Sequence, residues 1–195
     1  MTVLQITTIG DPVLRQRTAE MTLDELRCAE TQKLIDDLIE TRRAAGGAGL
    51  AAPQVGVPKR VAVCEVDAAT RYLYKPLIPL TVIVNPVIEP LGDPPPQLVI
   101  NEGCLSIPDL RGDVPRWLSV RVSYLDRHGE PHVCEVNGLT AGTFQHETDH
   151  LDGVLFPDLV TDTHTLSTWA QFDRFGREAF LKRVAPYTRG GELAG

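Results

Sequence analysis

Residues 146–150 read HETDH, so two histidines stand four positions apart with a glutamate directly after the first. In an α-helix, side chains at positions i and i+4 lie on the same face, which lets His146 and His150 bind one metal ion together. Glu147 then lies beside the position of a water on that ion, as metal-assisted hydrolysis requires. The motif therefore demands a helix, and it supplies two of the three protein ligands that a catalytic site of this kind takes.

The length and composition predict one globular domain. A chain of 195 residues with 43% hydrophobic residues can bury one core, so we expect a single catalytic domain at 1–184 and a disordered, Gly-rich tail at 185–195. The net charge of −7 argues against extended contact with DNA, which needs a basic surface. The sequence shows neither an apolar run of membrane-spanning length nor the pattern of a signal peptide, and this predicts a cytoplasmic protein with no membrane partner.

The hydrophobic patterns predict an α+β fold, with antiparallel strands packed around a central helix that carries the metal-binding motif. Thr22 and Glu25 form a capping box at the start of an N-terminal helix, and the glycines from Gly46 onward end it. The expected helices, the last of them C-terminal, are 23–45, 140–151 and 166–184. Segments rich in β-branched residues predict strands at 60–66, 80–88, 117–125 and 132–136. Pro86 indicates a bulge or an edge, and residues 126–129 a hairpin turn.

The third ligand decides what the motif does. His164 and Glu178 lie downstream, but the residues after His150 do not continue as the His-x-x-Gly-x-x-His pattern of metalloproteases. Upstream, Cys104 lies between Gly103 and Leu105 in a short segment before the 117–125 strand. A thiolate there would complete a Cys-His-His site with a fourth, open position.

Three segments stand in a fixed order along the chain: 47–54 (GAGLAAPQ), 102–106 (EGCLS) and 145–150 (QHETDH). Their flanks, 11–15 (DPVLR) and 151–156 (LDGVLF), follow the same pattern. Together these motifs resemble the peptide deformylase family over about residues 5 to 160. Three concordant motifs are far more specific than any one of them.

The resemblance implies an enzyme that hydrolyses the formyl group from the N-terminal formylmethionine of newly synthesised polypeptides and releases formate. On matching positions it makes Cys104, His146 and His150 the ligands of one divalent metal ion. That ion is typically Fe(II), and zinc, nickel or cobalt can occupy the site. Glu147 would be the general base and acid.

The same resemblance implies that Gln54 and the backbone N–H of Leu105 polarise the formyl oxygen. The residues expected to bind the substrate are Ala48, Gly49, Glu102, Leu139, Gly142 and Thr143. Gly142 and Thr143 are smaller than the side chains common in relatives, so the preference for the first side chain of the substrate is open.

Two alternatives remain beside this interpretation. A metallopeptidase would take a carboxylate or histidine as its third ligand, and a structural metal site or formyl-peptide-binding module would have a closed fourth position or lack the base. The oligomeric state is not predicted. The C-terminal region has a basic bias from Arg174, Arg177, Lys182, Arg183 and Arg189. We expect a solvated helix face there and, as a hypothesis, a transient contact with the ribosome.

Overall fold

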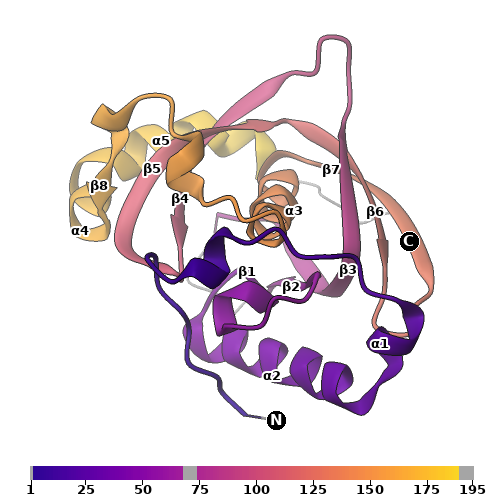
Figure 1. Cartoon of the computed structure of the whole chain (residues 1–195). Coiled ribbons are helices and arrows are strands. Elements are labelled where there is room, and N and C mark those ends of the chain that lie inside the picture. The colour runs from indigo at the N-terminus through magenta and orange to yellow at the C-terminus, as the bar shows by residue number, and fades with distance from the viewer. Residues whose placement is uncertain (1, 68–73, 189–195) are drawn as a thin grey trace.

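The computed structural model describes residues 2–67 and 74–188, in which helices and antiparallel strands form an α+β arrangement of two sheets (Figure 1). The five-stranded sheet has the order β1-β2-β3-β6-β7 and the three-stranded sheet the order β4-β5-β8. The strands of the larger sheet are β1 Gly49–Ala51, β2 Val61–Val66, β3 Ile78–Pro90, β6 Ser119–Leu125 and β7 Pro131–Asn137. Those of the smaller sheet are β4 Gln97–Cys104, β5 Ile107–Trp117 and β8 Ser167–Thr168. All pairs are antiparallel, as the sequence predicted.

Helix α3 (Gly138–Leu151) lies in the middle of the molecule and contacts strands of both sheets, whereas α2 (Ala29–Ala45) covers the other face of the larger sheet (Figure 1). Strand β2 separates the two helices and is buried throughout. Because successive side chains of a strand point to opposite faces, Cys64 packs in the cluster with Phe144 of α3, and Val63 packs in the cluster with Leu38 of α2. Helix α3, which carries the motif, therefore packs on a strand whose two faces are both buried, one against α3 and the other against α2.

The predicted N-terminal helix is two helices, α1 (Leu23–Arg27) and α2, so the single helix at 23–45 was wrong. The capping box is confirmed, because Thr22 Oγ1 accepts from the Glu25 N–H at 3.2 Å and Thr22 N donates to Glu25 Oε2 at 2.7 Å. The break falls at Cys28, whose backbone is extended. The side chain of Gln32 satisfies the Leu26 carbonyl that the break exposes, at 2.9 Å. Gly46, with a φ of 64°, ends α2 as expected.

The predicted strands are present, and the register shift between Val84 and Val87 confirms the bulge at Pro86. Trp117 was predicted to begin the strand at 117–125, but it is the last residue of β5, and β6 begins at Ser119. The long β4–β5 hairpin was not foreseen, because several of its buried residues are polar or charged and two prolines interrupt β5. These buried polar residues pair with each other across the hairpin, as Asn101 does with Asp113 at 2.7 Å.

The C-terminal region is also more broken than the predicted helix at 166–184. It consists of β8, a short helix α4 (Trp169–Gln171), a π-helical segment (Phe172–Gly176) and α5 (Arg177–Val184). Ala185–Tyr187, at the start of the expected tail, form a 3-10 helix. Residues 189–195, where the rest of the predicted disorder falls, lie outside the described residues. Over the described part of the chain, no helix has the length and apolar content needed to cross a bilayer.

Candidate metal centre and active site

Three potential metal ligands meet between the two sheets. His146 and His150 lie one helical turn apart on α3, with ring centroids 5.0 Å apart, and the end of β4 brings Cys104 Sγ to 3.2 Å from His150 Nε2. The ligand atoms of the three residues all lie within 4.8 Å of one another. Around one tetrahedral ion with bonds of about 2.0 to 2.3 Å, ligand atoms stand roughly 3.3 to 3.8 Å apart, so the group matches a single ion.

The tight turn of the β4–β5 hairpin presents the thiol of Cys104. Strand pairing brings Cys104 opposite Ile107, and the N–H of Ser106 points back to Cys104 Sγ at 3.4 Å. The side-chain amide of Gln54 approaches the same sulfur at 3.5 Å. Two N–H groups thus approach the sulfur, which is the atom of Cys104 that would bind a metal ion.

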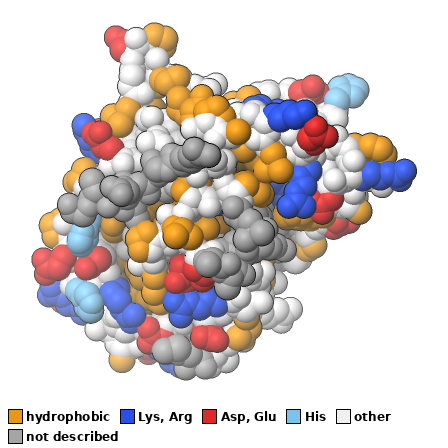
Figure 2. All heavy atoms as spheres, turned by 180° about the vertical axis from the view of Figure 1, so that it is seen from behind, with side chains coloured by type: hydrophobic (Ala, Val, Ile, Leu, Met, Phe, Trp, Pro, Cys, Tyr) orange, Lys and Arg blue, Asp and Glu red, His pale blue; other side chains and the backbone are white. Residues whose placement is uncertain are grey.

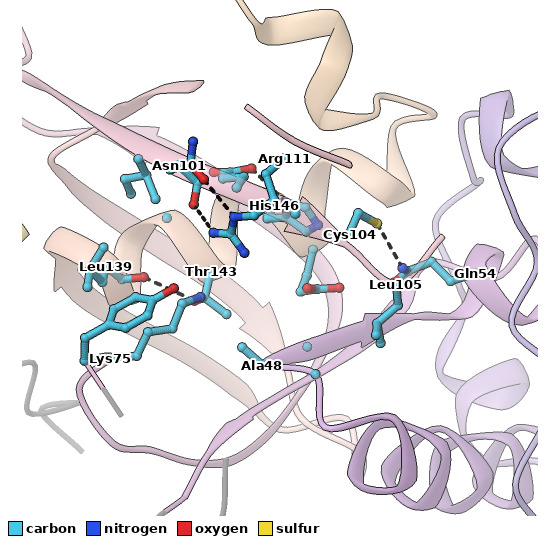
Figure 3. A pocket seen from close by; sticks show the side chains of 18 residues that line it. Ala48, Gln54, Lys75, Asn101, Cys104, Leu105, Arg111, Leu139, Thr143 and His146 are labelled. Atoms are coloured by element: carbon cyan, nitrogen blue, oxygen red, sulfur yellow. Dashed lines mark hydrogen bonds and ion pairs between the residues drawn. The ribbon is translucent and has the colours of Figure 1, made fainter. Parts of the chain in front are cut away.

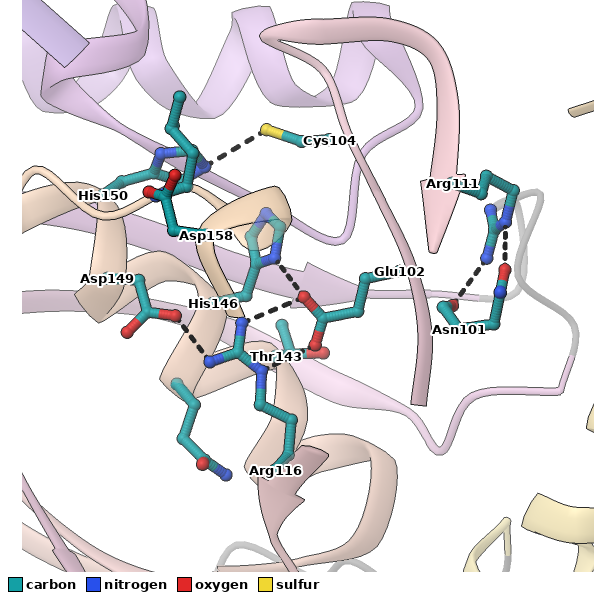
Figure 4. A network of polar contacts seen from close by, with 12 residues as sticks. Asn101, Glu102, Cys104, Arg111, Arg116, Thr143, His146, Asp149, His150 and Asp158 are labelled. Atoms are coloured by element: carbon teal, nitrogen blue, oxygen red, sulfur yellow. Dashed lines mark hydrogen bonds and ion pairs between the residues drawn. The ribbon is translucent and has the colours of Figure 1, made fainter. Parts of the chain in front are cut away.

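Glu102 holds His146 in place (Figure 4). Its Oε2 lies 2.9 Å from His146 Nδ1, and Arg116 donates to both of its carboxylate oxygens at 2.7 and 2.9 Å. Burial alone would raise the pKa of Glu102, but the charge and hydrogen bonds of Arg116 and His146 bring it well below its usual range. An ionised Glu102 can therefore accept a hydrogen bond from the Nδ1–H group of a neutral His146, and this leaves Nε2 for a metal ion.

His150 has the features of a neutral ligand. Burial lowers the pKa of its imidazole well below the ordinary value, and the positive charge of Arg116 acts in the same direction. Its Nδ1 is buried and has no hydrogen-bond partner within the described residues. Since a neutral imidazole offers a lone pair, His150 is ready to bind a cation without first losing a proton.

Glu147 lies beside the ligand group and against the backbone of β1. A Cβ atom at Gly49 would come within 2.3 Å of the Glu147 carboxyl carbon, so only glycine leaves room for this side chain. Burial raises the pKa of Glu147 to about 7. A carboxyl group with this pKa can both take and release a proton near neutral pH, as a general base and acid must.

The orientation of Gln54 is set by its own loop. Its Oε1 accepts from the backbone N–H of Ala51 at 2.8 Å, so its Nε2 must point the other way. That nitrogen donates to Ser106 Oγ at 3.2 Å, next to the Cys104 sulfur. Leu105 follows Cys104 directly, and its side chain packs near Gly47. The side-chain amide of Gln54, from the 3-10 helix Ala52–Val55, thus reaches the hairpin turn that contains Leu105.

A cavity of about 60 Å³ opens beside the three ligands (Figure 3). The residues predicted from the sequence that line it are Ala48, Gly49, Gln54, Glu102, Cys104, Leu105, Leu139, Gly142, Thr143, His146 and Glu147. The structure thus brings all of these together, with His150 just behind Cys104. Sequence reasoning missed Tyr74, Lys75, Ile100, Asn101 and Arg111, which also line the cavity. They lie in the unforeseen β4–β5 hairpin or in a loop without any pattern, so no signal in the sequence marked them.

A family model described as polypeptide deformylase matches residues 3–165 of the chain. The chain belongs to this family. A peptide deformylase of Leptospira biflexa is 40% identical over 178 residues, covering 91% of this chain and 98% of the relative. One of Heliobacterium modesticaldum is 45% identical over 161 residues, covering 82% and 95%. The Met-Ala-Ser-bound crystal structure of class I type b peptide deformylase from Acinetobacter baumannii is 35% identical, with a TM-score of 0.76, and covers 82% of this chain and 99% of that one.

The basic residues near the C-terminus of this deformylase are partly neutralised. Arg177 pairs with Asp173 at 3.4 Å, Lys182 with Glu178 at 2.6 Å, and Arg183 with Asp113 at 2.9 Å; Arg189 lies outside the described residues. On the face shown in Figure 2, acidic and basic side chains lie next to one another. These pairings do not favour a strongly basic surface, and the ribosome contact stays a prediction.

Proposed function

We propose that this chain removes the formyl group from the N-terminal methionine of newly made polypeptides in the cavity beside α3, using one divalent metal ion. As a polypeptide deformylase, it is a formyl-peptide hydrolase. The observation that carries the proposal is the convergence of Cys104, from a hairpin, with His146 and His150, from a helix, beside the carboxylate of Glu147.

The three residues fit a divalent ion in their chemistry as well as their spacing. One thiolate and two neutral imidazoles accept Fe(II), zinc, nickel or cobalt, and we propose Fe(II) as the ion. When bound, the ion supplies a Lewis acid for the formyl oxygen and lowers the pKa of a water. The thiolate reduces the net positive charge of the site, so a base next to it is needed.

Glu147 fills that need. Its carboxylate takes the proton from the water as the water attacks the formyl carbon, and then delivers that proton to the departing nitrogen of methionine. A pKa of about 7 suits both transfers. The result is formate and a peptide with a free N-terminal amine.

Gln54 Nε2 and the backbone N–H of Leu105 are proposed to donate to the formyl oxygen as negative charge develops on it. The bond from Ala51 N to Gln54 Oε1 keeps this amide in one orientation before the substrate arrives. A donor held in this way contributes about 3 to 4 kcal/mol to lowering the barrier in comparable sites.

A metallopeptidase is the rival function, and the positions of its candidate ligands speak against it. Among the described residues, the group of possible ligands around the two histidines contains Cys104 and neither His164 nor Glu178. Glu178 instead pairs with Lys182 on the exposed face of α5. Cys104 is therefore the third ligand that the geometry supports.

The test is formate release from formyl-Met-Ala-Ser by protein loaded anaerobically with Fe(II), since air can oxidise an iron-bound thiolate. We expect formate from the wild type, no cleavage of the unformylated peptide, and loss of both bound metal and activity in Cys104→Ala. Cys134→Ala, which removes a thiol of β7 outside the cavity, is the matched control. No formate from correctly loaded wild type would defeat the proposal. Metal retention with peptide-bond cleavage in Cys104→Ala would favour a metallopeptidase.

A further inference from the structure

The N-terminal segment, residues 7–18, contacts all three parts of the chain that build the site. In Figure 1 it is drawn in indigo and passes α2 and then α3 before the chain reaches α1. Three of its backbone N–H groups donate, each at 2.8 Å, to carbonyls in or directly after the motif segments: Thr7 to Gln54, Ile9 to Ser106 and Thr18 to Leu151. This one segment therefore joins a loop, a hairpin turn and a helix end that are far apart in the sequence.

The two proposed oxyanion donors come from different sheets. Gln54 lies in the 3-10 helix Ala52–Val55, which follows β1 of the larger sheet, and Leu105 lies in the turn between β4 and β5 of the smaller sheet. Among the described residues, no strand of one sheet pairs with a strand of the other. The pairing of β4 with β5 is also irregular next to the turn, with a register shift between Gly103 and Cys104. Regular strand pairing therefore does not fix the separation of the two donors.

The hydrogen bonds of Thr7 and Ile9 join the two donor loops through the backbone. Their N–H groups lie only two residues apart in one chain, so the carbonyls of Gln54 and Ser106 cannot move apart without loss of one of these bonds. Ser106 follows Leu105 directly, and a carbonyl of Ser106 that is held in place also limits the movement of the Leu105 N–H group. A backbone donor belongs to a planar peptide unit and has no side-chain torsions, which makes it a rigid point of attachment.

Apolar side chains fix the N-terminal segment against the same two loops. Leu14 is 1% exposed and packs in one cluster with Ile107, at the start of β5. Ile6, directly before the segment, packs against the cluster that contains Ala52. The side chain of Ile9 is 47% exposed, so its N–H group makes the connection to the hairpin turn. The segment is therefore held on both sides of the two backbone hydrogen bonds.

We propose that the backbone N–H groups of Thr7 and Ile9 position the two oxyanion donors and hold them at the separation that the developing negative charge requires. This inference rests on the proposed function. Neither residue lines the cavity, so each acts on the formyl group only through Gln54 and Leu105. These donors act on charge that develops in the transition state, and a misplacement of about 1 Å can lower a rate about 100-fold. Loss of one bond should therefore lower kcat and leave KM and metal binding nearly unchanged.

The experiment removes one backbone N–H group at a time. An amide-to-ester replacement, in which a residue is exchanged for its α-hydroxy acid, removes the donor and keeps the side chain. It is made at Thr7 and at Ile9, with Thr8 as the matched control, because the Thr8 N–H group makes no hydrogen bond within the described residues. Formate release from formyl-Met-Ala-Ser, counted per bound metal ion, gives kcat and KM. We expect kcat of the Thr7 and Ile9 esters to be about tenfold below that of the Thr8 ester, with KM and metal affinity within about twofold.

A second comparison separates positioning from a purely structural role. In the Gln54→Ala background, the Thr7 ester should lower kcat by less than about twofold, because the side-chain donor that Thr7 positions is absent. A segment that only stabilised the fold would lower the melting temperature of the esters and leave kcat per bound metal ion unchanged.

Values of kcat for both esters within about twofold of the Thr8 ester overturn the inference. An equal loss for the Thr7 ester with and without the Gln54 amide also overturns it, and so does a loss of metal affinity that accounts for the lost activity. Because kcat is counted per bound metal ion, a partial loss of folded protein does not imitate the expected result. Absence of formate from the wild type contradicts the proposed function instead.

Discussion

The Nδ1 atom of His146 lies 2.9 Å from Oε2 of Glu102, two residues before Cys104 on β4. One carboxylate thus joins the ligand helix to the ligand hairpin. Arg116 of β5 binds that carboxylate and also donates to Asp149 of α3 at 2.5 Å (Figure 4). A second set of polar contacts therefore joins the hairpin to the helix. The positions of the metal ligands therefore depend on residues that do not touch the ion.

Glu102→Gln should weaken metal binding about 10- to 100-fold, because a neutral amide polarises the His146 ring less than a carboxylate and leaves Arg116 without its main counter-charge. Competition with a chelator measures the affinity. Glu135→Gln, which removes the partner of Arg121 on the exposed face of β7, is the control. An affinity within twofold of the wild type would show that Glu102 has no such role.

Glu147→Gln should keep its metal and lose kcat by about 10² to 10⁴, since the amide cannot accept the proton of the attacking water. Metal analysis and formate release on the same preparation separate the two effects. Loss of metal in this variant would indicate that Glu147 is itself a ligand, and the assignment of roles would be wrong.

Gly49→Ala should reduce kcat by about 10²-fold, because the added Cβ forces the Glu147 carboxyl group to shift by 1 Å or so. Shortening the acid relieves this contact. In a double-mutant cycle, Glu147→Asp should therefore lower kcat less in the Gly49→Ala background than in the wild type. Strictly additive effects would mean that Gly49 acts on something other than Glu147.

Protein stability should depend on pH through Glu65. Hydrogen bonds from Arg43 lower its pKa against the effect of burial, and the charge of the buried Arg42 lowers it further. A pKa depressed in the folded state gives stability that is fully present above the unfolded-state value, 4.5, and is lost as the pH falls toward the folded-state value.

Glu65→Gln should accordingly reduce the free energy of unfolding by about 2 to 4 kcal/mol at pH 7, because it leaves Arg42 with an incomplete set of partners. Urea denaturation at pH 7 and pH 3 should show the difference between wild type and variant shrinking at the lower pH. A difference that grows on acidification would rule out this ion pair as its source.

Local patterns in the sequence were enough for the parts of the site that depend on local geometry. The spacing of His146 and His150 sets their common helix face, and Glu147 follows from it. Cys104 was raised as a candidate because it lies upstream of the motif, and the resemblance of its motif to a family then supported it. Nothing in its spacing says that a hairpin brings it back to the helix. The capping box at Thr22 was visible, but the break at Cys28 was not, since a single extended residue leaves no periodic trace.

The polar residues of the β4–β5 hairpin could not be recognised as buried. Glu102 and Arg116 look like surface residues until their pairing is known, because each is acceptable in the interior only with the other present. Lys75 could not be recognised as a cavity residue for a similar reason. It contacts Thr143, which lies far away in the sequence on α3 and meets Lys75 only in the folded chain.

Cys104 and His150 are 46 positions apart in the chain yet only 3.2 Å apart in space. An ion shared between them closes that long loop like a removable cross-link, and binding energy becomes folding energy. The melting temperature of the protein would then rise with metal concentration. A cell short of the metal would lose not only turnover but also some of the protein's resistance to unfolding.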